Sequence, residues 1–416
     1  MIRSMGAAGH DVAVAFRTLG CKVNRVESDS IAAELLGRGA RIVEEDEAEV
    51  VVINTCTVTA EADAKARKAI RQALKAEREP VVVVTGCLAA LDTPALRALG
   101  GRVVVESDKE RVAARVADLL GLDALAESRA STAARAGAGF RTRAALKIED
   151  GCDNFCTYCI VPRARGVPRG VPLAEVLAEA EVLVAAGVRE IVLTGINIGR
   201  YRDSATGADL AGLIVAVART GIQRLRLSSI EPPDLTERLI SALAETPAVC
   251  EHLHVPLQSG SDAVLSAMGR AYSTGEYRRR LAVARAAIPG LAVTTDVIAG
   301  FPGETDEAHA ETLAFVEEMG FAKLHVFRYS VRPGTPAAAM VQVAPEVRSE
   351  RAAEIRALGD GMRRRFAASR MGCDAEVLVE RVVDGLVSGT TRDYLKVSGP
   401  APKDAKAGDV VTLIIS

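Results

Sequence analysis

The sequence contains eight cysteines, and three of them stand together in the run GCDNFCTYC. Cys152, Cys156 and Cys159 have C-x3-C-x2-C spacing and follow a short apolar stretch typical of a strand. Three thiolates on one tight loop suit an iron–sulfur cube in which one iron has no protein ligand. The alternative is a structural zinc site, which needs four ligands and usually takes them from paired C-x2-C arms. No fourth Cys or His stands beside this triplet, so the spacing favours a cluster with an open iron.

Three further cysteines each follow a predicted strand. Cys21 comes after Phe16 and Leu19, Cys56 follows the run VVINT, and Cys87 follows VVVVTG. In an open parallel sheet the carboxyl ends of the strands share one edge, where ligands collect. We therefore expect these three thiols to converge, and the alternative is three unrelated buried thiols.

The elements that must position these cysteines follow a regular alternation in the first third of the chain. Apolar runs predict strands at 12–16, 50–53, 81–84 and 102–105, and amphipathic runs predict helices at 28–36 and 61–76. This order implies an α/β domain with a parallel sheet and helices on its faces, which we place at 1–123. The small and polar residues ALAESRASTAARAGA at 124–138 predict a linker.

The middle of the chain repeats a strand-then-helix unit. The six predicted strands are 145–148, 190–193, 224–227, 252–257, 292–298 and 323–329. Six such units predict a partial (β/α)6 barrel over 139–370, in which the loops after the strands carry the chemistry. Short strands at 377–379, 386–387, 394–397 and 410–415 then predict a small all-β barrel over 371–416. Its size and strand number are compatible with an oligonucleotide-binding fold.

The triplet after the first barrel strand resembles that of the radical S-adenosylmethionine (SAM) superfamily. Nearly the whole chain resembles the tRNA methylthiotransferases, through TLGCKVNRVESD, INTCTVT, VTGCLA, GCDNFCTYCIVPRARG and HLHVPLQSGSDAVLSAMGR. The segments LTGINIGRY, SSIEP and HVFRYSVRPGTPAAAM resemble the subgroup that acts on N6-threonylcarbamoyladenosine. The sister subgroup for isopentenyladenosine typically has Gly-Gln-Asn-Val where this chain has residues 195–198, Gly-Ile-Asn-Ile. Arg163 stands where the family usually has an aromatic residue.

The resemblance implies two [4Fe–4S] clusters with separate tasks. The cluster on Cys152, Cys156 and Cys159 would bind SAM and split it with one electron into methionine and a 5′-deoxyadenosyl radical. The cluster on Cys21, Cys56 and Cys87 would carry the sulfur that is transferred to carbon 2 of the adenosine next to the anticodon. A second SAM would supply the methyl group. Alternatives are isopentenyladenosine tRNA or a ribosomal-protein side chain as substrate, or a non-catalytic, metal-stabilised RNA-binding module.

Polar residues and glycines at the ends of the barrel strands are candidates for SAM contacts. They are Thr194, Gly195, Asn197, Ser228, Ser229, Glu231, His254, Gln258, Asp296 and Gly300. The alternative for each is barrel packing or helix capping, as for Ser261 and Asp306. His252 and His254 alternate on one strand and so share a face, where we expect hydrogen bonds in the barrel interior. Cys250 and Cys373 have no partner at ligand spacing and are expected to be buried thiols.

Composition limits the possible partners. The 416 residues are 49% hydrophobic and 25% charged with a net charge of −2, which excludes a disordered chain and a wholly basic nucleic-acid coat. Local arginine groups are either solvated helix faces or phosphate contacts; they are Arg278–Arg280, Arg363–Arg365 with Arg370, and Arg163, Arg165 and Arg169. Aromatic residues make up only 3%, so extensive base stacking is not expected; Phe366 and Tyr394 are the nearest candidates.

The expected partners follow from the chemistry implied above. They are a tRNA with an adenosine next to the anticodon, an electron donor of the flavodoxin or ferredoxin type, and a sulfur source. The apolar runs are far too short to cross a bilayer, and the N-terminus lacks the apolar core of a signal peptide. We therefore expect a cytoplasmic enzyme with no membrane partner, whose C-terminal β domain resembles the TRAM-like RNA-binding barrel of the family.

Overall fold

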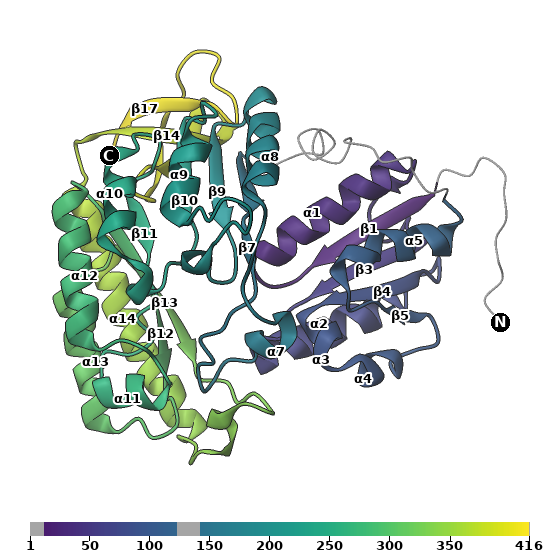
Figure 1. Cartoon of the computed structure of the whole chain (residues 1–416), viewed down its shortest axis with the longest axis horizontal. Coiled ribbons are helices and arrows are strands. Elements are labelled where there is room, and N and C mark those ends of the chain that lie inside the picture. Colours follow the sequence, from purple (N-terminus) through teal and green to yellow (C-terminus); the bar gives the residue numbers. More distant parts are fainter. Residues whose placement is uncertain (1–11, 123–141, 416) are drawn as a thin grey trace. The chain divides into compact units, whose positions relative to one another are not determined.

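The computed structural model describes residues 12–122 and 142–415, and its contacts divide the chain into two units (Figure 1). Unit 1 comprises Met1–Phe140 and Ile160–Gly166, and unit 2 comprises Arg141–Cys159 and Val167–Ser416. The segment Ile160–Gly166 therefore belongs to unit 1, although it directly follows the C-x3-C-x2-C motif. The linker predicted at 124–138 lies outside the described residues, and the four-part division of the chain stays a prediction.

Unit 1 is built on the predicted parallel sheet, with strand order β2-β1-β3-β4-β5. Its strands are β1 (Ala13–Thr18), β2 (Arg41–Ile42), β3 (Val50–Thr55), β4 (Val81–Gly86) and β5 (Val103–Val105). All six residues of β3 are buried, because helices cover both faces of the sheet; this explains the continuous Val and Ile runs. The short β2 was not predicted, since both of its residues are exposed.

Helices pack on the two faces of this sheet (Figure 1). One face is covered by α1 (Lys22–Gly37) and α5 (Val112–Leu120), through buried residues such as Ile31 and Val116. The other face is covered by α2 (Ala60–Ala73), α3 (Cys87–Leu91) and α4 (Thr93–Arg97), through residues such as Ile70 and Leu96. Among the described residues of unit 1, the other helical segments are the 3-10 turn η1 (Lys109–Arg111) and α7 (Val161–Arg165). The helix predicted at 28–36 begins earlier, at Lys22, directly after Cys21.

Unit 2 contains the six predicted parallel strands in chain order. One sheet consists of β6 (Arg143–Lys147), β9 (Glu190–Thr194) and β10 (Arg224–Leu227), and the next of β11 (His252–His254), β12 (Ala292–Ala299) and β13 (Lys323–Arg328). Parallel bridges from Leu225 to Val249 and from Ser229 to His254 join the two sheets. The partial barrel is therefore confirmed.

The helices of unit 2 lie outside these strands (Figure 1). They are α8 (Leu173–Ala185), α9 (Leu210–Ala218), α10 (Glu237–Glu245), α11 (Asp262–Ala267), α12 (Thr274–Ala287), α13 (Asp306–Met319) and α14 (Pro345–Ser369). The 3-10 turns are η2 (Ile198–Arg200), η3 (Pro232–Asp234) and η4 (Pro336–Ala339). A short antiparallel pair, β7 (Glu149–Asp150) and β8 (Arg169–Gly170), brackets the cysteine loop and was not predicted. Within the described ranges no helix has both the length and the apolar character needed to span a membrane.

The fourth barrel strand is shorter than predicted. It was expected to run from 252 to 257, but β11 ends at His254. Pro256 has no backbone N–H to donate to the ladder, and Gln258 adopts φ +66°. The chain rejoins the sheet only through a bridge between Gln258 and Val297.

The C-terminal region is the predicted all-β domain and forms an antiparallel half-barrel. Its strands are β14 (Asp374–Val383), β15 (Leu386–Thr391), β16 (Lys396–Pro400) and β17 (Val410–Ile414), in the order β16-β15-β14-β17. Strand β14 is much longer than the expected 377–379 and carries an irregularity between Val379 and Arg381. Buried apolar residues, among them Val377 and Leu413, form a small core in this domain.

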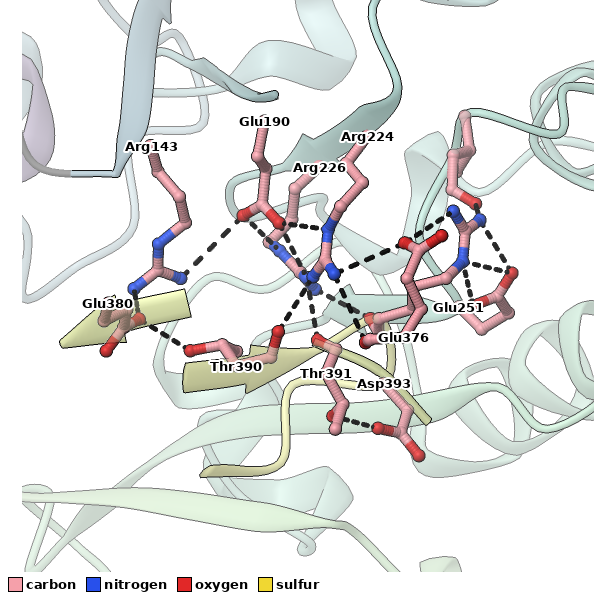
Figure 2. A network of polar contacts seen from close by, with 12 residues as sticks. Arg143, Glu190, Arg224, Arg226, Glu251, Glu376, Glu380, Thr390, Thr391 and Asp393 are labelled. Atoms are coloured by element: carbon pink, nitrogen blue, oxygen red, sulfur yellow. Dashed lines mark hydrogen bonds and ion pairs between the residues drawn. The ribbon is translucent and has the colours of Figure 1, made fainter. Parts of the chain in front are cut away.

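A buried charge network joins this β domain to the barrel (Figure 2). Arg224 and Arg226 lie two residues apart on β10, so they share a face, and both donate to the carboxylate of Glu190, at 2.8 Å and 3.1 Å. Other N–H groups of the two arginines donate to the β domain, to the backbone carbonyls of Thr390 and Thr391 and to the carboxylate of Glu376. These three charged side chains are essentially fully buried.

Tyr394 belongs to the same junction. Its ring stacks on His252 with a centroid distance of 4.4 Å, and the guanidinium of Arg226 lies 4.9 Å from the ring centre. Its aromatic face is therefore used inside the protein. Tyr394 was one of the two nearest candidates for base stacking, but its ring contacts His252 and Arg226 instead. These contacts depend on tertiary packing, so the sequence did not reveal them.

Candidate functional site

The three separate cysteines of unit 1 lie at the carboxyl ends of three neighbouring strands. Cys21 precedes α1, Cys56 follows β3 directly, and Cys87 is the first residue of α3 after β4. Burial is the main reason why the pKa of Cys56 is raised, and the nearby thiols of Cys87 and Cys21 raise it further. A Cβ on Gly20 would lie 2.5 Å from the Cβ of Cys56. The structure thus brings the three thiols together, as the strand pattern predicted.

Asn24 holds the loops of this site together. Its side chain is fully buried, and its Nδ2 donates to the carbonyl oxygens of Leu19 at 2.8 Å and Thr55 at 2.9 Å. Leu19 precedes Cys21, and Thr55 precedes Cys56. One amide, which was not predicted from the sequence, therefore fixes the two loops relative to each other.

Arg165 completes the surroundings of this site. It ends α7, and its Nε donates to Sγ of Cys87 at 3.3 Å while Nη1 donates to Oε1 of Glu27 at 2.9 Å. Burial is the main cause that raises the pKa of Cys87, and the charge of Arg165 opposes it. The expectation that Arg165 faces solvent or phosphate is therefore wrong, because its side chain is 1% exposed. Arg163, on the same short helix, is exposed.

The three cysteines of unit 2 lie on one tight loop. Gly151 and Phe155 adopt positive φ angles of +94° and +48°, and the N–H of Cys159 donates to the carbonyl of Cys156 at 2.9 Å. These left-handed backbone conformations let the chain turn sharply, so that the three cysteines fit on one short loop. The Cys152 thiol has a raised pKa, chiefly through burial and also through Cys156.

Both cysteine sets fit iron–sulfur cubes better than single metal ions. A zinc ion with Zn–S bonds of about 2.3 Å holds its sulfurs roughly 3.8 Å apart. Within the described ranges, neither cysteine set has its three sulfurs within 4.8 Å of one another. A cube spreads its thiolates over different irons, so a wider spacing suits it.

A cavity of about 220 Å³ opens beside Cys156. Arg270 donates from Nη1 to Sγ of Cys156 at 3.1 Å, and from Nη2 to the carboxylate of Glu231. The same guanidinium lies 5.0 Å from the ring centre of Tyr272. The cavity is lined by Asp153, Asn154, Cys156, Arg200, Glu231, Pro233, Asp234, Gly269, Arg270, Ala271 and Tyr272. Among the ten predicted SAM contacts, Glu231 is the one that lines this cavity. Arg270, which also lines it, was not predicted from the sequence.

The loop after β9 is held by a buried carboxyl group. Oε2 of Glu149 accepts the backbone N–H groups of Ile196 at 2.9 Å and Asn197 at 2.8 Å. Gly195 is needed there, because a Cβ would lie 2.8 Å from the same oxygen. Nδ2 of Asn197 lies 4.0 Å from Sγ of Cys152. Among the described residues, Oδ1 of Asn197 and Oγ of Ser228 are buried and have no hydrogen-bond partner, so both are available to a ligand.

The histidines of the barrel interior form a polar row. His252 and His254 both contact Oγ1 of Thr294, at 3.0 Å and 2.9 Å, so they share a face as predicted. Asp296 lies 3.2 Å from Nε2 of His254 and 3.3 Å from Nδ1 of His325. Burial alone would raise the pKa of Asp296, but these two contacts lower it to about 2. The ligand atoms of His254, Asp296 and His325 lie within 4.8 Å of one another, close enough to hold a cation.

The remaining predicted contacts have identifiable structural roles. Thr194 ends β9 and is buried, and Ser229 bridges to β11. Gln258 has the left-handed backbone described above. Gly300 leaves room for a neighbouring side chain, because a Cβ would lie 2.1 Å from Cγ of Arg348. Its contact with SAM stays a prediction, but packing against α14 already accounts for the glycine.

The surface arginine runs pair with acidic side chains. Arg278 contacts Glu318 and Arg280 contacts Glu276, while Arg365 of the second run contacts Glu317. Such pairs are typical of solvated helix faces. Cys250 is buried as expected, and Cys373 is only half-buried.

Two family models match the chain. Residues 146–316 match the radical SAM superfamily, and residues 13–105 match "Uncharacterized protein family UPF0004". The chain is similar to radical SAM methyltransferase TsrM from Kitasatospora setae, with a TM-score of 0.57 and 15% identity, over 91% of this chain and 81% of that one. This likeness supports the fold alone.

Curated relatives are closer in sequence. The threonylcarbamoyladenosine tRNA methylthiotransferase MtaB of Bacillus subtilis is 40% identical over 403 residues, which cover 92% of this chain and 89% of the relative. The tRNA-2-methylthio-N(6)-dimethylallyladenosine synthase of Acidothermus cellulolyticus is 37% identical, over 96% of this chain and 85% of the relative. A [4Fe–4S] cluster and SAM are the cofactors of the superfamily, and methylthiotransferases carry a second cluster. The chain belongs to the radical SAM tRNA methylthiotransferase family, within the threonylcarbamoyladenosine group.

Proposed function

We propose that this protein adds a methylthio group to carbon 2 of N6-threonylcarbamoyladenosine next to the anticodon of a tRNA. The observation that carries the proposal is the presence of two three-cysteine sets, each able to hold a cube with one open iron. One set suffices to hold the cluster that binds SAM, so the second set is available for the sulfur to be transferred. The threonylcarbamoyl substrate follows from the named relatives and from the LTGINIGRY, SSIEP and HVFRYSVRPGTPAAAM segments.

In unit 2, Cys152, Cys156 and Cys159 would hold the cluster that binds SAM. When bound, this cluster supplies the electron that cleaves SAM. Glu231 and Arg270 offer opposite charges beside Cys156, which suits the ammonium and carboxylate groups of an amino acid. Other polar barrel residues that would orient SAM are Thr194, Asn197, Ser228, Ser229, His254, Gln258 and Asp296, with Gly195 and Gly300 giving close approach.

In unit 1, Cys21, Cys56 and Cys87 would hold the second cluster, whose open iron would carry the sulfur for transfer. Thiolates from three strand ends would bind three irons of the cube and leave the fourth iron for the transferred group. The protein would also need a one-electron donor of the flavodoxin or ferredoxin type and a separate sulfur source. With a tRNA substrate, the enzyme would act in the cytoplasm, and the C-terminal half-barrel would act as its TRAM-like RNA contact.

Substrate choice can be tested with purified enzyme reconstituted anaerobically with iron and sulfide. The enzyme would be incubated with SAM, a reductant, and tRNA bearing either threonylcarbamoyladenosine or isopentenyladenosine, or with ribosomal protein. Mass spectrometry of the nucleosides should show the methylthio product from the first substrate. Product only from the second tRNA or from ribosomal protein would instead support those alternatives.

The cluster assignment is tested with cysteine variants. Cys156→Ala should still bind tRNA but give no methylthio product, whereas the control Cys373→Ala should keep activity. Full activity of Cys156→Ala would support a non-catalytic metal role. Iron analysis should give about eight irons per chain for two cubes, and about four would remove the second cluster and its role as sulfur carrier.

A further inference from the structure

A buried guanidinium lies beside the three cysteines of unit 1. The side chain of Arg165 is 1% exposed and directs three N–H groups at three different partners. Nε donates to Sγ of Cys87 at 3.3 Å, Nη1 donates to Oε1 of Glu27 at 2.9 Å, and Nη2 donates to Oδ1 of Asn24. The planar fork of arginine is well suited to fixing several acceptors at once.

Arg165 shares its carboxylate partner Glu27 with a second cation. Glu27 is also buried, and its Oε1 accepts a hydrogen bond from Nζ of Lys109 at 2.8 Å. Two cations therefore share one carboxylate, and this group of three side chains carries a net positive charge beside Cys87. In a buried environment this charge is screened much less than at the surface.

Arg165 is also connected to the other two cysteines through Asn24. The amide oxygen of Asn24 accepts from Arg165, and its Nδ2 donates to the carbonyls of Leu19 and Thr55. These carbonyls precede Cys21 and Cys56. One guanidinium thus contacts the third cysteine and, through a single amide, the loops of the first two.

Hydrogen bonds and positive charge at a thiolate ligand change the reduction potential of the cluster that it binds. An N–H donated to the sulfur stabilises the extra negative charge of the reduced cluster more than that of the oxidised cluster, which raises the reduction potential. Because hydrogen bonds to charged groups are roughly twice as strong as neutral ones, we expect an effect of about tenfold on the reduced-to-oxidised ratio.

We propose that Arg165 is a positioning residue of the iron–sulfur centre of unit 1, which orients Cys87 and raises the reduction potential of the cluster. Glu27 and Asn24 hold the guanidinium in place, and Glu27 limits its charge. The proposal rests on the proposed function only in assuming that Cys21, Cys56 and Cys87 hold a cluster.

The test uses the full chain with Cys152, Cys156 and Cys159 changed to Ala, so that one cluster remains. Iron content is measured first, and the midpoint potential is then determined by anaerobic titration followed by electron paramagnetic resonance. Arg165→Gln should keep about four irons. Its midpoint should shift to more negative potential by about tenfold in the reduced-to-oxidised ratio, which is about 59 mV for one electron.

Two further variants make the test specific. Arg163→Gln removes the same charge from an exposed position of the same helix and should leave the midpoint unchanged. Glu27→Gln keeps an acceptor for Arg165 but removes the balancing charge, so its midpoint should shift in the positive direction. Full iron content with an unchanged midpoint in Arg165→Gln, or an equal shift in Arg163→Gln, overturns the proposal.

Loss of iron, which is measured before the potential, distinguishes the proposed function from the role of Arg165. If the parent with three alanines binds no iron, the second cluster of the proposed function is wrong. If only Arg165→Gln loses its iron, the orienting role is supported. Arg165→Lys, which keeps the charge, and Glu27→Gln then measure the effect on potential, and unchanged midpoints in both would contradict it.

Discussion

The backbone N–H of Asn197 donates a 2.8 Å hydrogen bond to Oε2 of Glu149, a carboxyl group that is fully buried. Ile196 donates to the same oxygen, so this one side chain shapes the loop that is proposed to meet SAM. Within the described residues, the other carboxyl oxygen, Oε1, is buried without a hydrogen-bond partner. Burial outweighs the two backbone hydrogen bonds and raises the pKa of Glu149 to about 7.

Glu149 should make stability depend on pH. Its folded-state pKa lies above the ordinary value of 4.5, so the folded protein holds a proton between pH 4.5 and about 7 that the unfolded chain has lost. The contribution of Glu149 to the free energy of unfolding is therefore greatest below pH 4.5 and declines as the pH rises to about 7. Glu149→Gln should raise the free energy of unfolding at pH 8 by up to about 3 kcal/mol.

Urea denaturation of the variant and the parent at pH 5 and pH 8 measures this effect. Glu311→Gln, which changes an exposed carboxylate on α13, serves as the control and should keep the pH dependence of the parent. If Glu149→Gln gives the same difference between the two pH values as the parent, Glu149 does not titrate as described.

The variant Gly86→Ala tests how closely the chain packs beside Cys87. It has φ +91°, and a Cβ there would lie 2.4 Å from both Oδ1 of Asn54 and the carbonyl of Thr55. Gly39 has nearly the same φ, +89°, but no described heavy atom lies within 4 Å of its Cβ position. Alanine at either site incurs backbone strain of about 1–3 kcal/mol, but Gly86→Ala adds a steric clash.

We expect Gly86→Ala to lower the free energy of unfolding by about 2 kcal/mol more than Gly39→Ala. Because Cys87 is the next residue, Gly86→Ala should also retain less iron after reconstitution. Chemical denaturation and iron analysis of the two variants measure both effects. Equal losses in the two variants would mean that the strained φ angle, and not the contact with β3, determines the result.

The positions of the cysteines in the fold were predictable because their signals are local. Cys21, Cys56 and Cys87 each follow an apolar run, and parallel strands bring their carboxyl ends to one edge. The C-x3-C-x2-C spacing needs no tertiary information. The parallel order of the six barrel strands likewise follows from the alternation of strands and helices along the chain.

The residues that support these cysteines were not predictable in the same way. Arg165 stands in an arginine-containing run typical of a surface helix, yet its partners Cys87 and Glu27 are 78 and 138 residues away. Glu149 and Arg270 resemble ordinary charged residues until packing buries them beside the cysteine loop. Burial of a charged side chain depends on which distant groups compensate it, and no local pattern encodes that information.

Asp296 should stabilise the folded protein at neutral pH and lose this effect in acid. Contacts with His254 and His325 overcome the effect of burial and lower its pKa to about 2, from an ordinary value of 3.8. Its contribution is therefore present above pH 3.8 and is lost as the pH falls towards 2. Asp296→Asn should remove about 2 kcal/mol of unfolding free energy at pH 6 but little at pH 2.

Denaturation curves between pH 2 and pH 6 test this dependence on Asp296. The control is Asp360→Asn, because Asp360 is 60% exposed in an ion pair with Arg363 and such pairs contribute only about 0–1 kcal/mol. The control should therefore follow the parent at every pH. A loss in Asp296→Asn that is the same at pH 2 and pH 6 would rule out the titration and leave only a packing role.

Glu190 should be essential for the junction between the barrel and the half-barrel. Its carboxylate is fully buried and accepts from Arg224 and Arg226, with Arg143 at 3.9 Å (Figure 2). Glu190→Gln leaves two buried guanidinium groups without their shared counter-charge, and breaking a buried pair in this way costs about 3–5 kcal/mol. We expect a lower denaturation midpoint and faster tryptic cleavage next to Arg370, where the β domain begins.

The matched control for Glu190 is Glu318→Gln, which removes the acid of a pair with Arg278 in which both side chains are about half exposed. Exposed pairs contribute about 0–1 kcal/mol, so this variant should keep the midpoint and the cleavage rate of the parent. Because the two arginines also donate to backbone carbonyls of the β domain, their hydrogen bonds could hold the junction without Glu190. Equal midpoints in the two variants would show that these hydrogen bonds suffice, whereas a selective loss in Glu190→Gln would show that the buried carboxylate stabilises the junction.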